Sequence, residues 1–124
     1  MIPFLALMLA ASSPDPDPLR TAVEACDREA MATLAKAEPR RRAEWAEAIY
    51  REQRSIAADR AALAPAATTT AGQATLASAK SALDTRQQQL EDARGVERAW
   101  REYFDEYRAD FLASCSTRKH DDAR

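Results

Sequence analysis

The sequence predicts an all-α protein, and three observations carry that prediction. Alanine, arginine, glutamate, leucine and glutamine, which are strong helix formers, dominate residues 19–118. The chain holds only two glycines. No stretch shows the alternation of β-branched or aromatic residues with polar ones that is typical of a half-buried strand. A chain of 124 residues fits one domain, which we place at residues 19–118.

The chain opens with an apolar run over residues 2–11. This run is too short to cross a bilayer, which takes about 20 residues, and it matches the core of a signal peptide. Ala10 and Ser12 supply the small side chains that a signal peptidase accepts, although no Lys or Arg precedes the run. We therefore predict a cleaved signal peptide at residues 1–13, a periplasmic or secreted protein, and no stable membrane insertion after cleavage.

The first arm of the helical domain follows a Pro/Asp linker at residues 14–18, where Asp17 is a natural N-cap. Pro39 should end or kink the first helix, because proline removes a backbone donor. A second helix then follows. The apolar positions expected on these two helices are Leu19, Val23, Cys26, Ala30, Thr33 and Ala37, then Trp45, Ile49, Ile56 and Leu63.

The second arm is predicted to be one long helix. Residues 64–73 contain a proline, three threonines and a glycine and should form a loop, whereas Ala74 to Thr117 contains no proline. Such a helix is roughly 65 Å long. Its apolar positions follow one seven-residue frame, interrupted at Arg86 and Glu97, and they are Leu76, Ala79, Leu83, Leu90, Ala93, Trp100, Phe104, Tyr107 and Phe111.

The expected architecture is a long antiparallel helical hairpin, with its first arm broken or kinked near Pro39 and its second arm one long helix. In this hairpin Gly95 would lie opposite a residue between about 42 and 46, a window that includes Trp45 and would let the glycine accommodate the indole ring. The alternative is an up-down four-helix bundle with a turn at Gly95, which would place a single glycine among good helix formers.

The two cysteines fit the hairpin. With the turn in the 64–73 loop, Cys26 faces a residue between about 111 and 115, and Cys115 lies at the edge of that window. We expect a Cys26–Cys115 disulfide, which would stabilise the fold by roughly 4 kcal/mol in the chain-entropy model. An exported chain with two cysteines is consistent with such a bond.

Little in the sequence indicates catalysis. The net charge of −2 comes from interspersed charges and gives no reason to expect nucleic acid as a partner. The one histidine, His120, falls in a predicted disordered tail, residues 119–124, so we predict no catalytic residue, no metal site, no cofactor and no enzyme. We interpret the basic run formed by Arg40, Arg41 and Arg42 as the solvent-exposed start of a helix.

The final helix carries the candidate binding site. Its aromatic face can be core, covered by Leu19, Val23 and Met31, and any uncovered remainder can bind a protein or a second copy of the chain, because Trp, Tyr and Arg are typical anchors. The candidate binding residues are Trp100, Tyr103, Phe104, Tyr107, Phe111 and Arg101.

We therefore predict an exported, non-enzymatic helical protein that acts by protein binding or self-association as a scaffold or adaptor on the envelope side. The alternative is a small inhibitor or regulator of a secreted or cell-wall-active enzyme. A cysteine near each end and an aromatic-rich final helix resemble the small exported domains of LprI-type lysozyme inhibitors. That resemblance is confined to the end of the chain, and those domains generally carry more cysteines, so it assigns no functional residue here.

Overall fold

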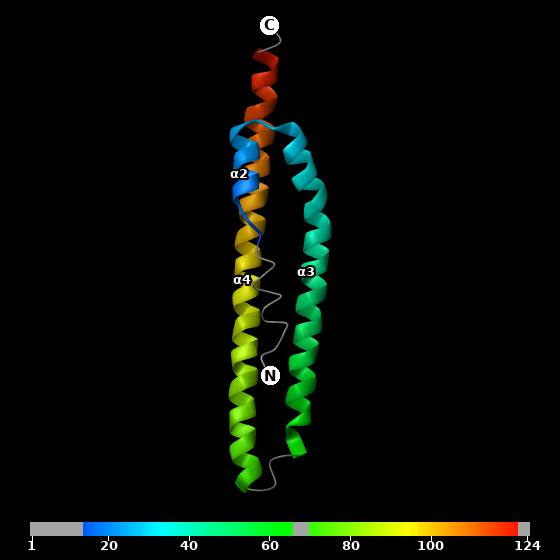
Figure 1. The fold of residues 1–124 in the computed structure, drawn as a ribbon, viewed down its shortest axis with the longest axis vertical. Helices are drawn as coiled ribbons and strands as arrows, with labels where there is room; N and C mark the ends of the chain where they lie inside the picture. The colour runs from blue at the N-terminus through cyan, green and yellow to red at the C-terminus, as the bar shows by residue number, and fades with distance from the viewer. Residues whose placement is uncertain (1–13, 66–69, 122–124) are drawn as a thin grey trace. The chain divides into compact units, whose positions relative to one another are not determined.

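The computed structural model describes residues 14–65 and 70–121, with side chains up to Cys115. The predicted signal peptide at 1–13 lies outside the described residues, as do part of the predicted loop and the end of the predicted tail. Over the described ranges the protein has three helices and no strand (Figure 1). This confirms the all-α fold class.

Helix α2 spans Asp17–Glu24 and begins one residue earlier than expected. Asp17 lies in its first turn instead of capping it, and the backbone N–H of Asp17 donates to the Asp15 carboxylate at 3.0 Å. The Asp17 carboxylate accepts a hydrogen bond from Arg20 at 2.6 Å. The buried side of α2 consists of Leu19, Ala22 and Val23.

The first arm is interrupted at Cys26 and not at Pro39. Helix α3 spans Arg28–Ala62 and contains Pro39 in its interior. Proline removes one backbone hydrogen bond from a helix, and this long helix has contacts with α4 on both sides of Pro39 that offset the loss. The break falls instead at Cys26, which adopts a φ of 49°.

Helix α4 spans Thr70–Asp121 and confirms the predicted second arm as one long helix of 52 residues. It runs without interruption through Gly95, so the turn required by the four-helix alternative is not present. Gly95 is exposed, and a Cβ added there would have no other atom within 4 Å. The expectation that Gly95 accommodates the Trp45 ring is therefore wrong, because no side chain packs against this position.

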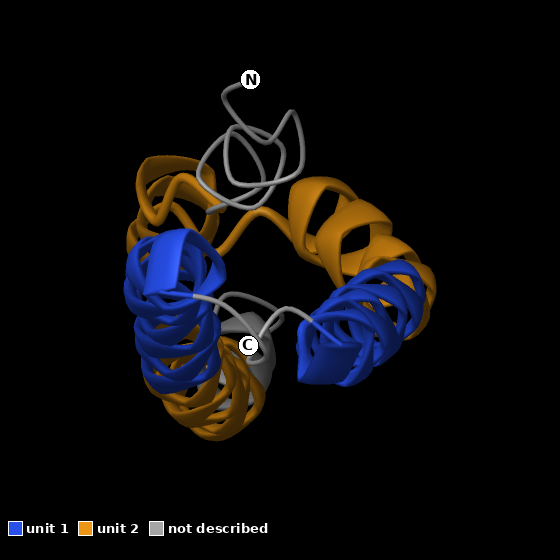
Figure 2. Ribbon diagram, turned by 90° about the horizontal axis from the view of Figure 1, so that it is seen from below, with its two compact units in different colours: residues 1–12, 44–95 blue, residues 13–43, 96–124 orange. Residues whose placement is uncertain are grey.

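The chain divides into two compact units, coloured separately in Figure 2. The hairpin unit comprises the described residues of 44–95. Within it α3 and α4 are antiparallel, because Glu52 pairs with Arg86 while Arg60, further along α3, pairs with Asp84, earlier in α4. The core of the hairpin unit consists of Ile49, Ile56, Leu83 and Leu90, with Trp45, Leu63 and Ala93 packed against it.

The disulfide unit comprises α2, the start of α3 up to residue 43, and α4 from residue 96. Here too α3 and α4 are antiparallel: Glu38 contacts Trp100, and Arg41 contacts Glu97. The core of the disulfide unit consists of Leu19, Val23, Met31, Phe104, Phe111 and Cys115. The disulfide unit contains all six predicted binding residues, two of them in its core, so the candidate site belongs to this unit.

Candidate functional site

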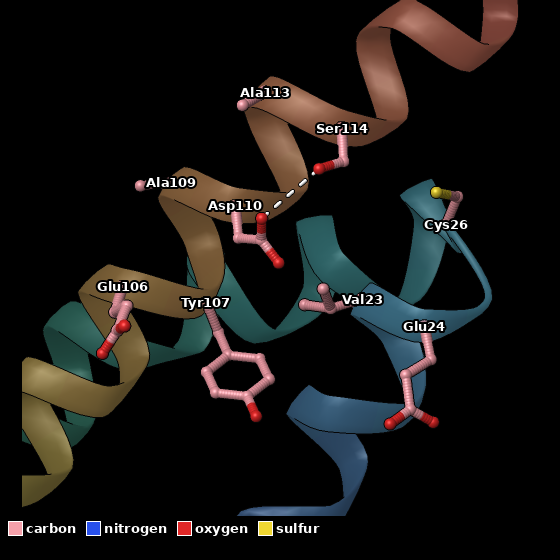
Figure 3. A pocket seen from close by; sticks show the side chains of 9 residues that line it. All are labelled: Val23, Glu24, Cys26, Glu106, Tyr107, Ala109, Asp110, Ala113 and Ser114. Atoms are coloured by element: carbon pink, nitrogen blue, oxygen red, sulfur yellow. Dashed lines mark hydrogen bonds between the residues drawn. The ribbon is translucent and has the colours of Figure 1, made fainter.

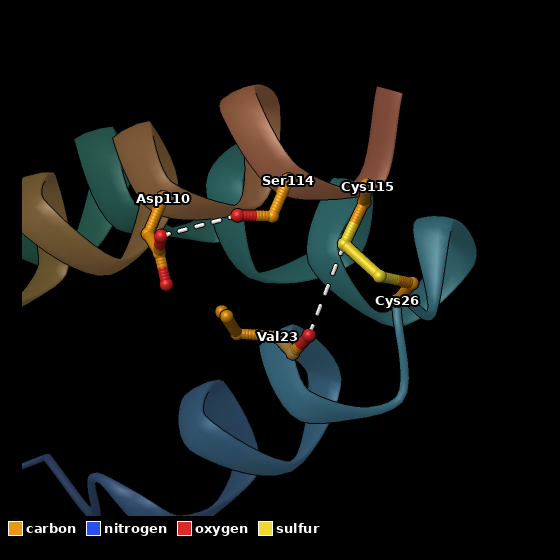
Figure 4. Close-up of a disulfide and its surroundings, with 5 residues drawn as sticks. All are labelled: Val23, Cys26, Asp110, Ser114 and Cys115. Carbon is orange, nitrogen blue, oxygen red and sulfur yellow. Dashed lines mark hydrogen bonds between the residues drawn. A yellow bond between two sulfur atoms is a disulfide. The ribbon is translucent and has the colours of Figure 1, made fainter. Parts of the chain in front are cut away.

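The disulfide ties the turn after α2 to α4 (Figure 4). Cys26 and Cys115 are bonded, with their Cα atoms 5.4 Å apart, as the hairpin register predicts. Cys115 is buried, and its Sγ lies 3.8 Å from the carbonyl oxygen of Val23, whereas Cys26 is partly exposed. Such a bond is compatible with an exported protein.

The predicted aromatic face is divided between core and surface. Phe104 and Phe111 are buried, at 3% and 8% exposure, in the same cluster as Leu19, Val23 and Met31, the residues expected to cover them. These two rings are not accessible to a partner in this conformation. The remaining aromatic residues of the face are only partly buried, and we call them the aromatic ladder: Trp100, Tyr103 and Tyr107.

The rings of the aromatic ladder contact one another in sequence. The ring centroids of Trp100 and Tyr103 are 6.1 Å apart, and those of Tyr103 and Tyr107 are 4.3 Å apart. Trp100 also contacts buried Phe104 at 5.9 Å. Burial and a hydrogen bond with Tyr107 raise the pKa of Tyr103. The ladder is therefore a row of partly exposed rings packed on the core, two of which carry phenol groups.

Beneath Trp100 lies a network of buried charges. Glu38 and Glu97 are 6% and 5% exposed, and Arg41 donates two hydrogen bonds to each carboxylate, at 2.7 to 3.0 Å. Trp100 Nε1 donates to Glu38 Oε1 at 2.8 Å, and Arg42 Nε donates to the same oxygen at 2.8 Å. This network fixes the orientation of the indole ring.

The pKa values of Glu38 and Arg41 are shifted in the directions expected for an ion pair. Burial raises the pKa of the Glu38 carboxyl, but hydrogen bonds from Arg41, Arg42 and Trp100 outweigh it, so the pKa lies below its ordinary value of 4.5. The hydrogen bonds from Arg41 to Glu38 raise the pKa of the Arg41 guanidinium despite its burial. Both groups are therefore charged at neutral pH.

The basic run and Arg101 are not simply solvated charges. Arg41 and Arg42 are partly buried and pair with carboxylates, which corrects the expectation of a solvated helix start for these two residues. Arg101 pairs with buried Glu97 at 2.8 Å. Sequence reasoning noted Glu97 only as an interruption of the apolar frame and missed Glu38. A charged residue at a seam position of each arm is the signal that could have found this network.

A groove lies between α2 and α4 beside the aromatic ladder (Figure 3). Its volume is about 730 Å³. Tyr107 belongs both to this groove and to the ladder, and three carboxylates line the groove, one from α2 and two from α4. The lining residues are Val23, Glu24, Cys26, Glu106, Tyr107, Ala109, Asp110, Ala113 and Ser114.

Among the described residues, no three His, Cys, Asp or Glu side chains come together in a way that could hold a metal ion. None of the described helices has a stretch apolar and long enough to cross a bilayer. The side chain of His120 lies outside the described residues.

The candidate site thus consists of the aromatic ladder, the charge network that orients Trp100, and the acidic groove next to Tyr107. Comparison of the chain with protein-family models, with curated proteins and with solved structures found no match in any of the three.

Proposed function

We propose that this is an exported, non-enzymatic helical protein that binds another protein through the aromatic ladder and the adjoining acidic groove. The observation that carries the proposal is the position of Tyr107, which is shared by both features. Partly exposed Trp and Tyr rings held on a core are typical interface anchors, because they bury a large area at little entropic cost.

The chemistry of the site favours a particular kind of partner. An apolar or aromatic side chain can pack against the partly exposed rings of Tyr103 and Tyr107. A Lys or Arg side chain beside it would meet the carboxylates of Glu24, Glu106 and Asp110 across the groove. The proposed partner is therefore a protein segment that presents a basic residue next to an apolar one. Export is supported by the disulfide and by the apolar N-terminal run in the sequence.

The proposal is tested first by finding the partner at the site. A photo-crosslinking residue is placed at Tyr107 of the exported protein, and a second one at Tyr50, which is 59% exposed in the hairpin unit and serves as the control position. We expect a specific adduct from position 107 and none from position 50. The adduct is identified by mass spectrometry, which also shows whether the partner is a second copy of the chain.

The second test compares how tightly two variants bind the identified partner. With the purified partner, we expect Tyr107→Ala to weaken binding by at least about tenfold, as for an interface anchor, and Tyr50→Ala to leave it unchanged. Binding should also weaken as salt rises, because the groove is acidic. Equal affinity of the two variants would contradict the proposal. If the partner is a secreted enzyme that loses its activity in a 1:1 complex, the protein is an inhibitor acting through the same site.

A further inference from the structure

The turn between α2 and α3 has an unusual composition. The chain changes direction over residues 25–27, an Ala-Cys-Asp sequence without glycine or proline. Cys26 is the one non-glycine residue with positive φ in the described chain, at 49°. This left-handed conformation is unfavourable for a residue with a Cβ, and glycine normally occupies it at the end of a helix.

The backbone hydrogen bonds show which position this is. The N–H of Cys26 donates to the carbonyl of Val23 at 3.2 Å, and the N–H of Asp27 donates to the carbonyl of Ala22 at 2.9 Å. This is the Schellman pattern, in which Cys26 takes the usual glycine position. The Asp27 carboxylate then accepts from the N–H of Ala30 at 3.0 Å and caps α3.

The amino-acid sequence around the turn favours a continuous helix and not a bend. Leu19, Val23, Cys26 and Ala30 are spaced as one face of a continuous helix, and the sequence alone predicts no break before Pro39. The hydrogen bonds of the turn offset only part of the cost of the left-handed conformation at Cys26, so contacts outside the turn must also hold the bent conformation. The structure offers two: burial of the α2 side chains Leu19, Ala22 and Val23, and the Cys26–Cys115 bond. Helix α2 has only eight residues and cannot persist as an isolated helix.

We propose that α2 is a hinged cover, held closed by the disulfide. When the bond is reduced, the chain straightens at Cys26, α2 continues α3 as one helix, and the part of the aromatic core around Phe104 and Phe111 becomes accessible. The cover lies next to the aromatic ladder, so its biological effect, regulation of partner binding, rests on the proposed function. The conformational change itself does not.

The redox step requires a dithiol reductant. One thiolate of the dithiol attacks Cys26 Sγ, because Cys26 is partly exposed at the groove while Cys115 is buried. The Sγ–Sγ bond breaks, and Cys115 leaves as a thiolate and takes up a proton. The second thiol of the dithiol then attacks the mixed disulfide and releases Cys26 as a thiol. The protein gains two thiols, and the dithiol is oxidised to its own disulfide.

The hinge is tested with two full-chain variants that differ at Cys26 alone. Both lack the disulfide: one is Cys26→Ala with Cys115→Ala, and the other is Cys26→Gly with Cys115→Ala. Alanine favours the straight helix, whereas glycine adopts the left-handed conformation without steric cost and destabilises a helix interior. Because both variants lack the disulfide, any difference between them comes from the backbone conformation that residue 26 prefers.

The readout is the distance between spin labels at Glu24 of α2 and Glu106 of α4, which line the same groove. The labels are introduced as unnatural amino acids, so that they add no thiol. Oxidised wild type and the glycine variant should give the short distance. The alanine variant, and wild type treated with a dithiol, should give a longer one, with the open-to-closed ratio roughly five- to thirtyfold higher for alanine than for glycine. Circular dichroism should show helix content retained or increased in the alanine variant.

Two results overturn the proposal. Short distances in both variants would mean that packing alone holds α2 closed. Long distances in both, or a loss of helix content on opening, would mean that α2 frays instead of joining α3. Neither result bears on partner binding by the oxidised protein, and a failure of partner binding would leave these distances unaffected.

Discussion

Single residues in this protein carry more structural information than their type suggests. Glu38 reads in the sequence as one more charge on a helical surface, yet it is 6% exposed and accepts hydrogen bonds from Arg41, Arg42 and Trp100. Burial of a carboxylate is tolerated only where such donors are present. Glu38 thus links the stability of the disulfide unit to the orientation of the ladder's first ring.

Acid should weaken the fold through Glu38. Its pKa in the folded protein lies below the ordinary value of 4.5, so the folded state binds fewer protons, and Glu38 contributes stability above about pH 4.5. That contribution is lost as the pH falls through the folded-state pKa. We expect the free energy of unfolding, measured with urea, to fall on acidification below this value. Glu38→Gln should show a smaller fall, whereas the exposed control Glu91→Gln should behave as wild type.

Gly95 is a single residue whose replacement should raise the stability of the protein. It is exposed in the interior of α4, and an added Cβ would meet no other atom within 4 Å. Gly95→Ala should therefore stabilise the protein by about 0.5–1 kcal/mol, from helix preference and a less flexible unfolded chain. Urea unfolding measures the gain, and Ala99→Gly, at an exposed site of the same helix, should cost a similar amount. A loss of stability in Gly95→Ala would show that the glycine serves a contact.

At the scale of elements, the helical seams are only partly apolar. In the hairpin unit, Arg86 donates to Glu52 at 3.0 Å, to Asp59 at 2.6 Å and to Ser55 at 3.1 Å, between layers formed by the four core aliphatics. The two interruptions in the apolar frame of α4, Arg86 and Glu97, are thus the positions that pair with buried Glu52 and partly buried Arg41 of α3. A charged layer in an apolar seam favours one register over shifted ones.

A double-mutant cycle measures how strongly Arg86 and Glu52 are coupled. Arg86→Met leaves Glu52 buried without its partner and should lower the free energy of unfolding by about 3 kcal/mol. Glu52→Leu should cost less, because Arg86 keeps Asp59. The double variant, with an apolar layer, should be near wild type or more stable. Urea unfolding of all four proteins gives the coupling energy, and an additive cycle would contradict a coupled pair.

Sequence reasoning succeeded where an element depends on local preference and failed where distant contacts decide. The long α4 follows from good helix formers without proline, and the Cys26–Cys115 pairing follows from counting along an antiparallel hairpin. The break at Cys26 could not be predicted from the sequence, because no glycine or proline marks it and the contacts that hold it, burial of α2 and the Cys26–Cys115 bond, join residues far apart in the chain. Pro39 carries the usual signal of a helix end, yet contacts between α3 and α4 override it. For the candidate site, the aromatic face was predictable, but the division between buried Phe104 and the partly exposed ladder was not.

At the scale of the whole molecule, the disulfide encloses most of the sequence. Cys26 and Cys115 are 89 positions apart, and the hairpin unit lies entirely between them in the chain. A cross-link around so long a loop restricts the unfolded chain much more than the folded one. The bond therefore stabilises the folded state of the whole enclosed segment, including residues that do not contact it.

Removal of the disulfide should lower the free energy of unfolding by about 4 kcal/mol in the chain-entropy model. Urea unfolding of Cys26→Ala with Cys115→Ala, compared with oxidised wild type, measures the loss. Wild type under reducing conditions should match the variant, and the variant itself should not respond to reductant. Equal stability of variant and oxidised wild type would show that the unfolded chain is already compact without the bond.

The same closed loop has a mechanical consequence. If the chain is pulled from points on either side of the bond, the force passes from Cys26 to Cys115 through the two sulfur atoms and bypasses residues 27–114. Helix α3 and most of α4 are then shielded from tension, and only the stretches between the bond and the two pulling points can extend. Reduction would place the whole helical domain under load, so the length that the chain yields under force would report directly on the state of one covalent bond.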